Sequence, residues 1–314
     1  MSQRVAVFVG EALGRYRFPE GHPFSIDRQH GFWSAARNQG LDKQVEIALP
    51  RQADIAELAR FHTEKHIELV RHQSRLGRGF LDYGDTPAFP GVFEAASTVA
   101  GSALEGAERI LAGENRRTFQ AVGGLHHARP EGAAGFCVFN DLGVLIRTLR
   151  EKHGIHRIAY VDIDVHHGDG VFYTFEDDPH LIFADIHEDG RYIYPGTGDA
   201  AETGSGPAHG TKINLPLPPG ATDRDFCEAW EQAFEHLRRH PPEFIILQCG
   251  ADSLRGDPLA HLRLTPESHA LAARTLCDLA DEVCDGRLMA FGGGGYEPRN
   301  LAAAWCAVLE ELVR

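Results

Sequence analysis

Short, continuous apolar runs recur along this chain, and stretches with helical periodicity separate them. Runs of this kind are typical of strands buried on both faces, as in a parallel sheet covered by helices. Parallel neighbours need a crossover connection, usually a helix, so the alternation indicates repeated βαβ units. We therefore expect an α/β fold with a mostly parallel central sheet flanked by helices. The expected strands are residues 4–9, 118–122, 157–163, 181–186, 244–249 and 287–291.

Several of the expected helices have recognisable first residues. Asn140 and Thr222 are favourable N-caps for two of them, and Thr265 followed by Pro266 opens a third. No low-complexity linker, internal repeat or change in composition divides the 314 residues. The sequence thus predicts a single domain that spans residues 1–314.

Charge and cysteine usage exclude several classes of protein. The formal net charge of −14 argues against direct nucleic-acid binding, which needs a basic surface, and it suits a cationic substrate better. The first ten residues show no cleavable signal, and no apolar stretch is long enough to span a bilayer, so we expect a cytoplasmic protein without a membrane anchor. The six cysteines form no CxxC pair, which argues against a thiolate zinc site or a disulfide framework.

Polar residues of unusual type follow four of the predicted strands. His126 and His127 come after the second run, an Asp/His-rich stretch at 160–170 closes the third, and Asp252 and Tyr296 follow the last two. Ligands bind beyond the carboxyl ends of the strands in open α/β sheets. We expect these side chains to form one site, although single polar residues at strand ends can also serve as helix caps.

The stretch 160–170 has the spacing of a metal site. Side chains alternate along a strand, so Asp162, Asp164 and His166 fall on one face. Asp164 and His166 can grip one ion together, and Asp252 can supply a third ligand. Two carboxylates and an imidazole suit Zn²⁺ in an open catalytic site, with Fe²⁺, Co²⁺ or Mn²⁺ as substitutes. Asp162 lies one step deeper and is better placed to orient other groups.

Four motifs in a fixed order resemble the zinc-dependent histone deacetylase family, which includes bacterial acetoin-utilization and acetylpolyamine deacetylases. They are GGLHHA at 123–128, DIDVHHGDG at 162–170, GADSLRGDP at 250–258 and GGGGY at 292–296. The resemblance runs almost end to end and implies an arginase/deacetylase-like fold. It implies zinc-dependent hydrolysis of acyl amides, most simply deacetylation of acyl-lysine side chains in proteins or peptides.

The resemblance assigns the same three metal ligands as the spacing, namely Asp164, His166 and Asp252. It also implies a monovalent cation, K⁺, near Asp162 and Asp164. Many family members carry serine in the following strand where this chain has Asp185, so potassium binding is less firmly implied than zinc binding.

The catalytic roles also follow from the resemblance. His126 and His127 match the tandem histidines that flank the attacking water, and Asp162 and Asp169 match the acids that hydrogen-bond them. His127 would take the proton of the water, and His126 would act as an electrostatic partner. Tyr296 matches the tyrosine that stabilises the oxyanion of the tetrahedral intermediate.

Five further residues match the family's substrate channel. Phe136, with Gly135 beside it, and Tyr194 match two aromatic walls that would enclose the alkyl chain of the substrate. Asp85 matches a rim acid that in some members accepts hydrogen bonds from substrate backbone amides, which favours peptides. Leu259 stands where polyamine-selective relatives can carry glutamate.

Three other interpretations compete with this one. A binuclear ureohydrolase of the arginase-like fold would need an acid where this chain has Gly168, so we expect one metal ion. An acetylpolyamine or other small acetylated-amine deacetylase differs only at the channel mouth and stays the alternative. A non-catalytic acetyl-ligand binding protein would be expected to lack part of the machinery. His167 faces away from the ligands and is interpreted as structural. The acyl group, the physiological substrate and the oligomeric state are left open by the sequence.

Overall fold

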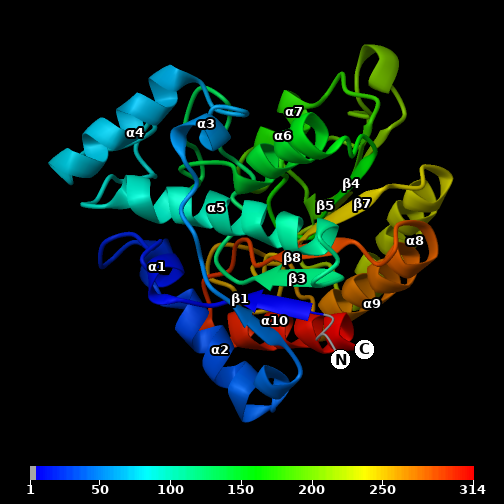
Figure 1. The fold of residues 1–314 in the computed structure, drawn as a ribbon. Helices are drawn as coiled ribbons and strands as arrows, with labels where there is room; N and C mark the ends of the chain where they lie inside the picture. The colour runs from blue at the N-terminus through cyan, green and yellow to red at the C-terminus, as the bar shows by residue number, and fades with distance from the viewer. Residues whose placement is uncertain (1–4) are drawn as a thin grey trace.

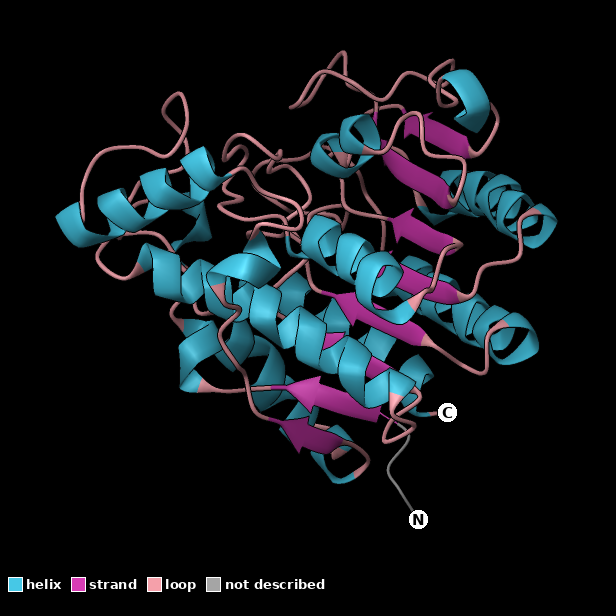
Figure 2. Cartoon of the chain, turned by 45° about the horizontal axis from the view of Figure 1, so that its top comes forward, coloured by secondary structure: helices cyan, strands magenta, loops and turns pink. Residues whose placement is uncertain are grey.

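The fold is built on one parallel sheet that has helices on both faces (Figures 1 and 2). The computed structural model describes residues 5–314. Its sheet has eight strands in the order β2-β1-β3-β8-β7-β4-β5-β6, and every neighbouring pair is parallel. The strands are β1 Val5–Phe8, β2 Glu46–Ala48, β3 Arg117–Gln120, β4 Ile158–Asp162, β5 Leu181–Glu188, β6 Lys212–Leu217, β7 Phe244–Gln248 and β8 Leu288–Phe291.

The predicted α/β fold is confirmed, and the six predicted strands all occur, with ends that differ by at most two residues from those expected. The first was expected to begin at residue 4, which lies outside the described residues. The apolar runs did not reveal β2 and β6, the two edges of the sheet. An edge strand is covered less completely: Ile47 in β2 is 52% exposed, and β6 alternates buried with half-buried residues. Neither strand therefore carries the continuous apolar run that marks the six inner ones.

The helices cover the sheet in two groups. Buried side chains of α2, α8, α9 and α10 pack on one face, and those of α5, α6 and α7 pack on the other (Figure 1). The α-helices are α1 Glu11–Gly14, α2 Arg28–Asn38, α3 Ile55–Leu58, α4 Glu64–Leu76, α5 Val92–Leu111, α6 Asp141–His153, α7 Asp169–Thr174, α8 Asp223–Arg239, α9 Pro266–Val283 and α10 Pro298–Val313. Among the described residues, no helix has the length and apolar character needed to cross a bilayer.

The expected first residues of three helices are confirmed. The Asn140 side chain accepts a hydrogen bond from Gly143 N at the start of α6. Thr222 precedes α8, where the Asp225 carboxylate accepts from its backbone N–H and from its hydroxyl. Thr265 and its following proline open α9. These local sequence signals define the residue at which each of the three helices begins.

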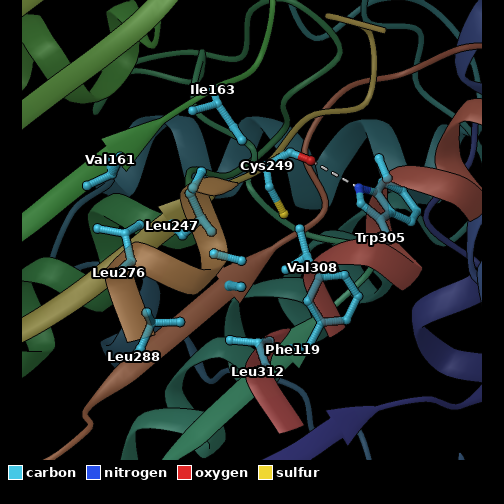
Figure 3. Packing of buried hydrophobic residues seen from close by; sticks show 14 of the residues in the cluster. Phe119, Val161, Ile163, Leu247, Cys249, Leu276, Leu288, Trp305, Val308 and Leu312 are labelled. Carbon is cyan, nitrogen blue, oxygen red and sulfur yellow. Dashed lines mark hydrogen bonds between the residues drawn. The ribbon is translucent and has the colours of Figure 1, made fainter. Parts of the chain in front are cut away.

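One buried aromatic side chain ties α10 to the strand ends near the candidate site. The Trp305 indole N–H lies 3.1 Å from Cys249 O, after β7, and 3.0 Å from Gly292 O, after β8. Figure 3 shows this side chain beside Phe119 and Val308, in the layer between α10 and the sheet. The backbone segments that lead from β7 to Asp252 and from β8 to Tyr296 are thus anchored to the packed core.

Two helix glycines should respond oppositely to alanine. A Cβ on Gly101, within α5, would lie 2.3 Å from Ala53 N and 2.4 Å from Arg51 O, so Gly101→Ala should destabilise the protein by about 1–3 kcal/mol. A Cβ on Gly31, in α2, would meet no atom within 4 Å, and Gly31→Ala should stabilise it by about 0.5–1 kcal/mol. Denaturant unfolding of both variants measures this. Similar effects of the same sign would contradict the close packing of α5 on residues 51–53.

Candidate active site

The polar residues singled out from the sequence lie beyond the carboxyl ends of four strands that are consecutive in the sheet. The order β3-β8-β7-β4 places these strands side by side. His126 and His127 follow β3, Tyr296 follows β8, Asp252 follows β7, and the Asp/His stretch follows β4. Residues far apart in the chain therefore reach one edge of the sheet.

Asp164, His166 and Asp252 form a buried group of potential metal ligands. One ligand atom from each lies within 4.8 Å of the other two. His166 Nδ1 lies 3.0 Å from Asp164 Oδ1 and 3.2 Å from Asp252 Oδ2. All three residues are at most 8% exposed. The arrangement brings two carboxylates and one imidazole nitrogen to a common point.

The electrostatics of this group fit a divalent cation. Burial lowers the pKa of His166, but Asp164 and Asp252 outweigh it and raise that pKa to about 10. Burial and the Asp164 charge also raise the pKa of Asp252. Two buried carboxylates this close together require a positive partner. A divalent ion bound to a neutral His166 supplies that charge, so this donor set could hold such an ion.

The tandem histidines touch each other, and each has its own carboxylate. Their Nε2 atoms are 3.1 Å apart. His126 Nδ1 lies 2.8 Å from Asp162 Oδ2, and His127 Nδ1 lies 2.7 Å from Asp169 Oδ1. Asp169 also accepts a hydrogen bond from Arg129 at 2.9 Å. The pairing expected for the four residues is therefore present in the structure.

The two histidines have opposite pKa shifts. Burial opposes protonation of both, but Asp162 and Asp164 raise the pKa of His126 to about 9. Burial and then the neighbouring charge of His126 lower the pKa of His127 to about 4. In the metal-free protein His126 therefore holds a proton much more readily than His127, whose imidazole is neutral at neutral pH.

Asp162 is the last residue of β4 and lies deeper in the sheet than Asp164 and His166, as its position in the sequence indicates. Its Oδ1 accepts a hydrogen bond from Asp164 N, and its Oδ2 accepts from His126 and from the Tyr160 hydroxyl. Asp185, in the adjacent strand, bonds to His187 Nδ1 at 2.7 Å and accepts from Gly168 N at 2.9 Å. Both Asp185 oxygens therefore have protein partners.

Tyr296 lies at the end of the glycine run and faces a narrow pocket. This pocket, of about 20 Å³, is lined by residues that include His126, His127, Asp164, His166 and Tyr296. Burial and the Asp252 charge raise the pKa of the tyrosine hydroxyl, so it stays protonated and can donate a hydrogen bond at neutral pH.

Two aromatic rings flank this pocket. The Phe136 ring lies 6.0 Å from the Tyr296 ring, and the Tyr194 ring lies 5.0 Å from that of His127. Gly135 closely approaches His127, since a Cβ at this position would lie 2.5 Å from its ring. Phe136 has φ of 68°, an unusual value for a residue other than glycine. The substrate-channel role expected for these three residues stays a prediction.

A wider cleft of about 680 Å³ opens beside this channel. Its lining includes Asp85, Gly135 and Tyr194, together with Asp82 and Glu131. Burial and the neighbouring Asp82 raise the pKa of Asp85 to about 6. Leu259 is 37% exposed and is not part of this lining. A separate cavity of about 950 Å³ is lined by residues that include Arg15, Phe18 and Ser25, and none of the predicted site residues lines it.

Two residues near the site were not predicted from the sequence. Gln248 donates to Asp164 Oδ2 at 2.8 Å, and as a lone polar residue in an apolar run it could have been noticed. Arg28 is buried, donates to Gly293 O at 2.9 Å and stacks on Phe24, while its Nε and Nη1 have no hydrogen-bond partner among the described residues. Arg28 is the first residue of α2, and nothing in the polar sequence around it marks it as a site residue.

Comparisons with known proteins give a consistent result. A family model described as histone deacetylase domain matches residues 22–312. Acetoin utilization protein AcuC of Bacillus subtilis is 37% identical over 322 residues, covering 98% of this chain and 82% of that protein. Histone deacetylase RPD3 of Saccharomyces cerevisiae is 34% identical over 313 residues, covering 97% and 70%.

Solved structures agree with these matches. The crystal structure of the HDA15 HD domain superimposes with a TM-score of 0.91 at 29% identity, covering 100% of this chain and 89% of that one. The crystal structure of an HDAC homolog complexed with SAHA has a TM-score of 0.88 at 31% identity, covering 99% and 84%.

Two adjacent histidines should differ in their effect on metal content. His166→Ala removes one of three convergent ligand atoms and should lower bound divalent metal by at least about tenfold. His167 instead bonds through Nδ1 to Thr197 Oγ1 at 2.9 Å, so His167→Ala should keep near wild-type metal content. Elemental analysis of both purified variants checks this. Loss of metal from the His167 variant alone would contradict the ligand set.

Proposed function

Because the chain belongs to the histone deacetylase family, whose members are hydrolases acting on acyl amide bonds, we propose that it is a zinc-dependent deacylase of acyl-lysine side chains in proteins or peptides. The observation that carries this proposal is the group of Asp164, His166 and Asp252 next to the paired histidines. We treat residues 1–314 as one catalytic domain. A cytoplasmic location is supported by six free cysteines.

Zinc is the metal that this donor set favours, with Fe²⁺ and Co²⁺ as possible substitutes. Asp164, His166 and Asp252 would hold it. When bound, the ion would polarise the acyl carbonyl and lower the pKa of water toward about 7. The K⁺ expected near Asp162 and Asp164 stays a prediction. Both oxygens of the neighbouring Asp185 are already hydrogen-bonded, to His187 and to Gly168.

His127 is the general base of the proposed reaction. It is neutral at pH 7, and Asp169 fixes its ring through the bond to Nδ1, so Nε2 can take a proton from the attacking water. The same nitrogen can then protonate the leaving amine. Asp162 raises the pKa of His126, so a protonated His126 would stabilise negative charge that develops on the substrate.

Tyr296 is the hydrogen-bond donor to the oxyanion. Its hydroxyl is protonated at neutral pH, and its ring borders the same pocket as His126 and His127. Removing one such donor typically slows a hydrolase by about 10²–10³-fold. Gly135, Phe136 and Tyr194 would enclose the methylene chain and align the amide with these groups.

The channel mouth supports a peptide substrate and keeps a second candidate. Asp85 lies exposed at the rim, where its carboxylate can accept hydrogen bonds from backbone amides. The same cleft contains Asp82 and Glu131, and their charge also suits the distant ammonium group of an acetylated polyamine. Leu259 supplies no acid on that side, which favours the peptide.

Activity on an acetyl-lysine peptide tests the proposed chemistry. Zinc-loaded protein should release the acetyl group, lose this activity with a chelator and regain it with added Zn²⁺. Tyr296→Phe should reduce kcat by about 10²–10³-fold with unchanged zinc content, because only the donor to the oxyanion is lost. An active chelated protein would reject the metal-dependent mechanism. A fully active Tyr296→Phe variant would reject the assigned donor.

A side-by-side panel of acyl-lysine peptides and acetylated polyamines separates the two substrates. Asp85→Ala should raise KM for peptides by about tenfold and affect polyamines less, because the amine lacks backbone amides. Glu131→Ala is the matched control, an acid of the same cleft that should affect peptides little. Peptide KM should also rise below about pH 6, where Asp85 takes up a proton. Equal effects of Asp85→Ala on both substrates would remove the reason for preferring peptides.

A further inference from the structure

Asp257 links the connection after β7 to the tyrosine of the proposed reaction. Its Oδ2 accepts a hydrogen bond from Tyr296 N at 2.7 Å, and its Oδ1 accepts from Leu259 N at 2.9 Å. The residue is only 7% exposed. One buried carboxylate thus joins two segments, and 39 positions of sequence separate Asp257 from Tyr296.

The backbone that carries Tyr296 needs such an anchor. Gly293 and Gly295 precede Tyr296 and have φ of 67° and 119°, values that glycine adopts freely. Because glycines have no side chains, no side-chain packing fixes this stretch of backbone. Upstream, Gly294 N donates to Asp164 Oδ2 at 2.7 Å. Gly294 O also accepts a hydrogen bond from Ala251 N at 3.0 Å. Gly295 separates these bonds from the tyrosine, and the hydrogen bond of Tyr296 N to Asp257 is the next one along the backbone.

The Tyr296 ring has contacts of its own, and the Arg28 guanidinium carbon lies 5.6 Å from its centre. The ring makes edge contacts with Phe136 and Phe24, whose ring centres lie 6.0 and 6.4 Å away. Edge contacts of this kind limit the tilt of a ring but do not fix the peptide that carries it. A displacement of about 1 Å at a catalytic group can cost about 10²-fold in rate.

We propose that Asp257 is a positioning residue that fixes the Tyr296 backbone so that its hydroxyl points into the reaction pocket. This inference rests on the proposed function of Tyr296 as oxyanion donor. Asp257 acts through the tyrosine and does not touch substrate. Because its second oxygen holds Leu259 N, the residue also ties the outer part of the same connection to the tyrosine.

A double-mutant cycle tests this role. Asp257→Ala should lower kcat by about 10–100-fold with KM and zinc content nearly unchanged, and it should cause less than about a twofold further loss in a Tyr296→Phe background. Asp257→Asn keeps one acceptor oxygen and should recover part of the activity. Equal losses from Asp257→Ala in both backgrounds would overturn the inference, because the carboxylate would then act independently of the tyrosine hydroxyl.

Asp223→Ala is the matched control for general loosening of this connection. Asp223 accepts hydrogen bonds from Thr265 N and Ser268 Oγ, at the far end of the same connection. Its loss should lower stability and leave kcat near the wild-type value.

Amide hydrogen exchange in the segment 292–297 supplies a readout that does not need activity. Exchange at this segment should accelerate in Asp257→Ala and not in Asp223→Ala. Unchanged exchange in Asp257→Ala would overturn the anchoring itself. A wild-type protein without deacylase activity would reject the proposed function, while the exchange measurement still decides the anchoring.

Discussion

The site depends on how buried negative charge is balanced. Asp162, Asp164, Asp185 and Asp252 are all fully buried at the carboxyl edge of the sheet. Burial of an unpaired carboxylate costs several kcal/mol in a protein interior. Three histidines lie next to these carboxylates. His126 pairs with Asp162 and His187 with Asp185, and His166 lies between Asp164 and Asp252. The last group has more carboxylates than imidazoles, and this excess is what makes a divalent cation fit there.

The sheet brings these charges together because of its strand order rather than its sequence order. The four strands that carry the site are neighbours, although β3 and β8 are separated by most of the chain. Close approach also needs small residues. A Cβ on Gly250 would lie 2.1 Å from Asp164 Oδ2, and one on Gly294 would lie 2.1 Å from Asp252 Oδ2. Glycine at these positions leaves room for the carboxylates to converge.

Local sequence patterns predict the inner sheet and the grouping of the three candidate metal ligands, Asp164, His166 and Asp252. Continuous apolar runs mark strands covered on both faces, and the acids and histidines stand directly after them. The edge strands β2 and β6 lack such a run because solvent reaches part of each, so the pattern does not reveal them. Contacts such as that of Arg28 with Gly293 join segments 265 residues apart. Asp257 lies in a motif that was recognised, but its bond to Tyr296 depends on how two loops fold together.

The different states of the adjacent histidines follow from their surroundings rather than from their own chemistry. His126 faces the Asp162 carboxylate, which has no arginine partner among residues 5–314, and the further charge of Asp164 lies 3.9 Å from its Nε2. His127 faces Asp169, whose charge Arg129 already compensates, and it also feels the cation next to it. Because the two Nε2 atoms are in contact, a proton held by His126 disfavours a second on His127. In the proposed reaction, this difference assigns the acceptance of a proton from water to His127 and the stabilisation of the oxyanion to the positive charge on His126.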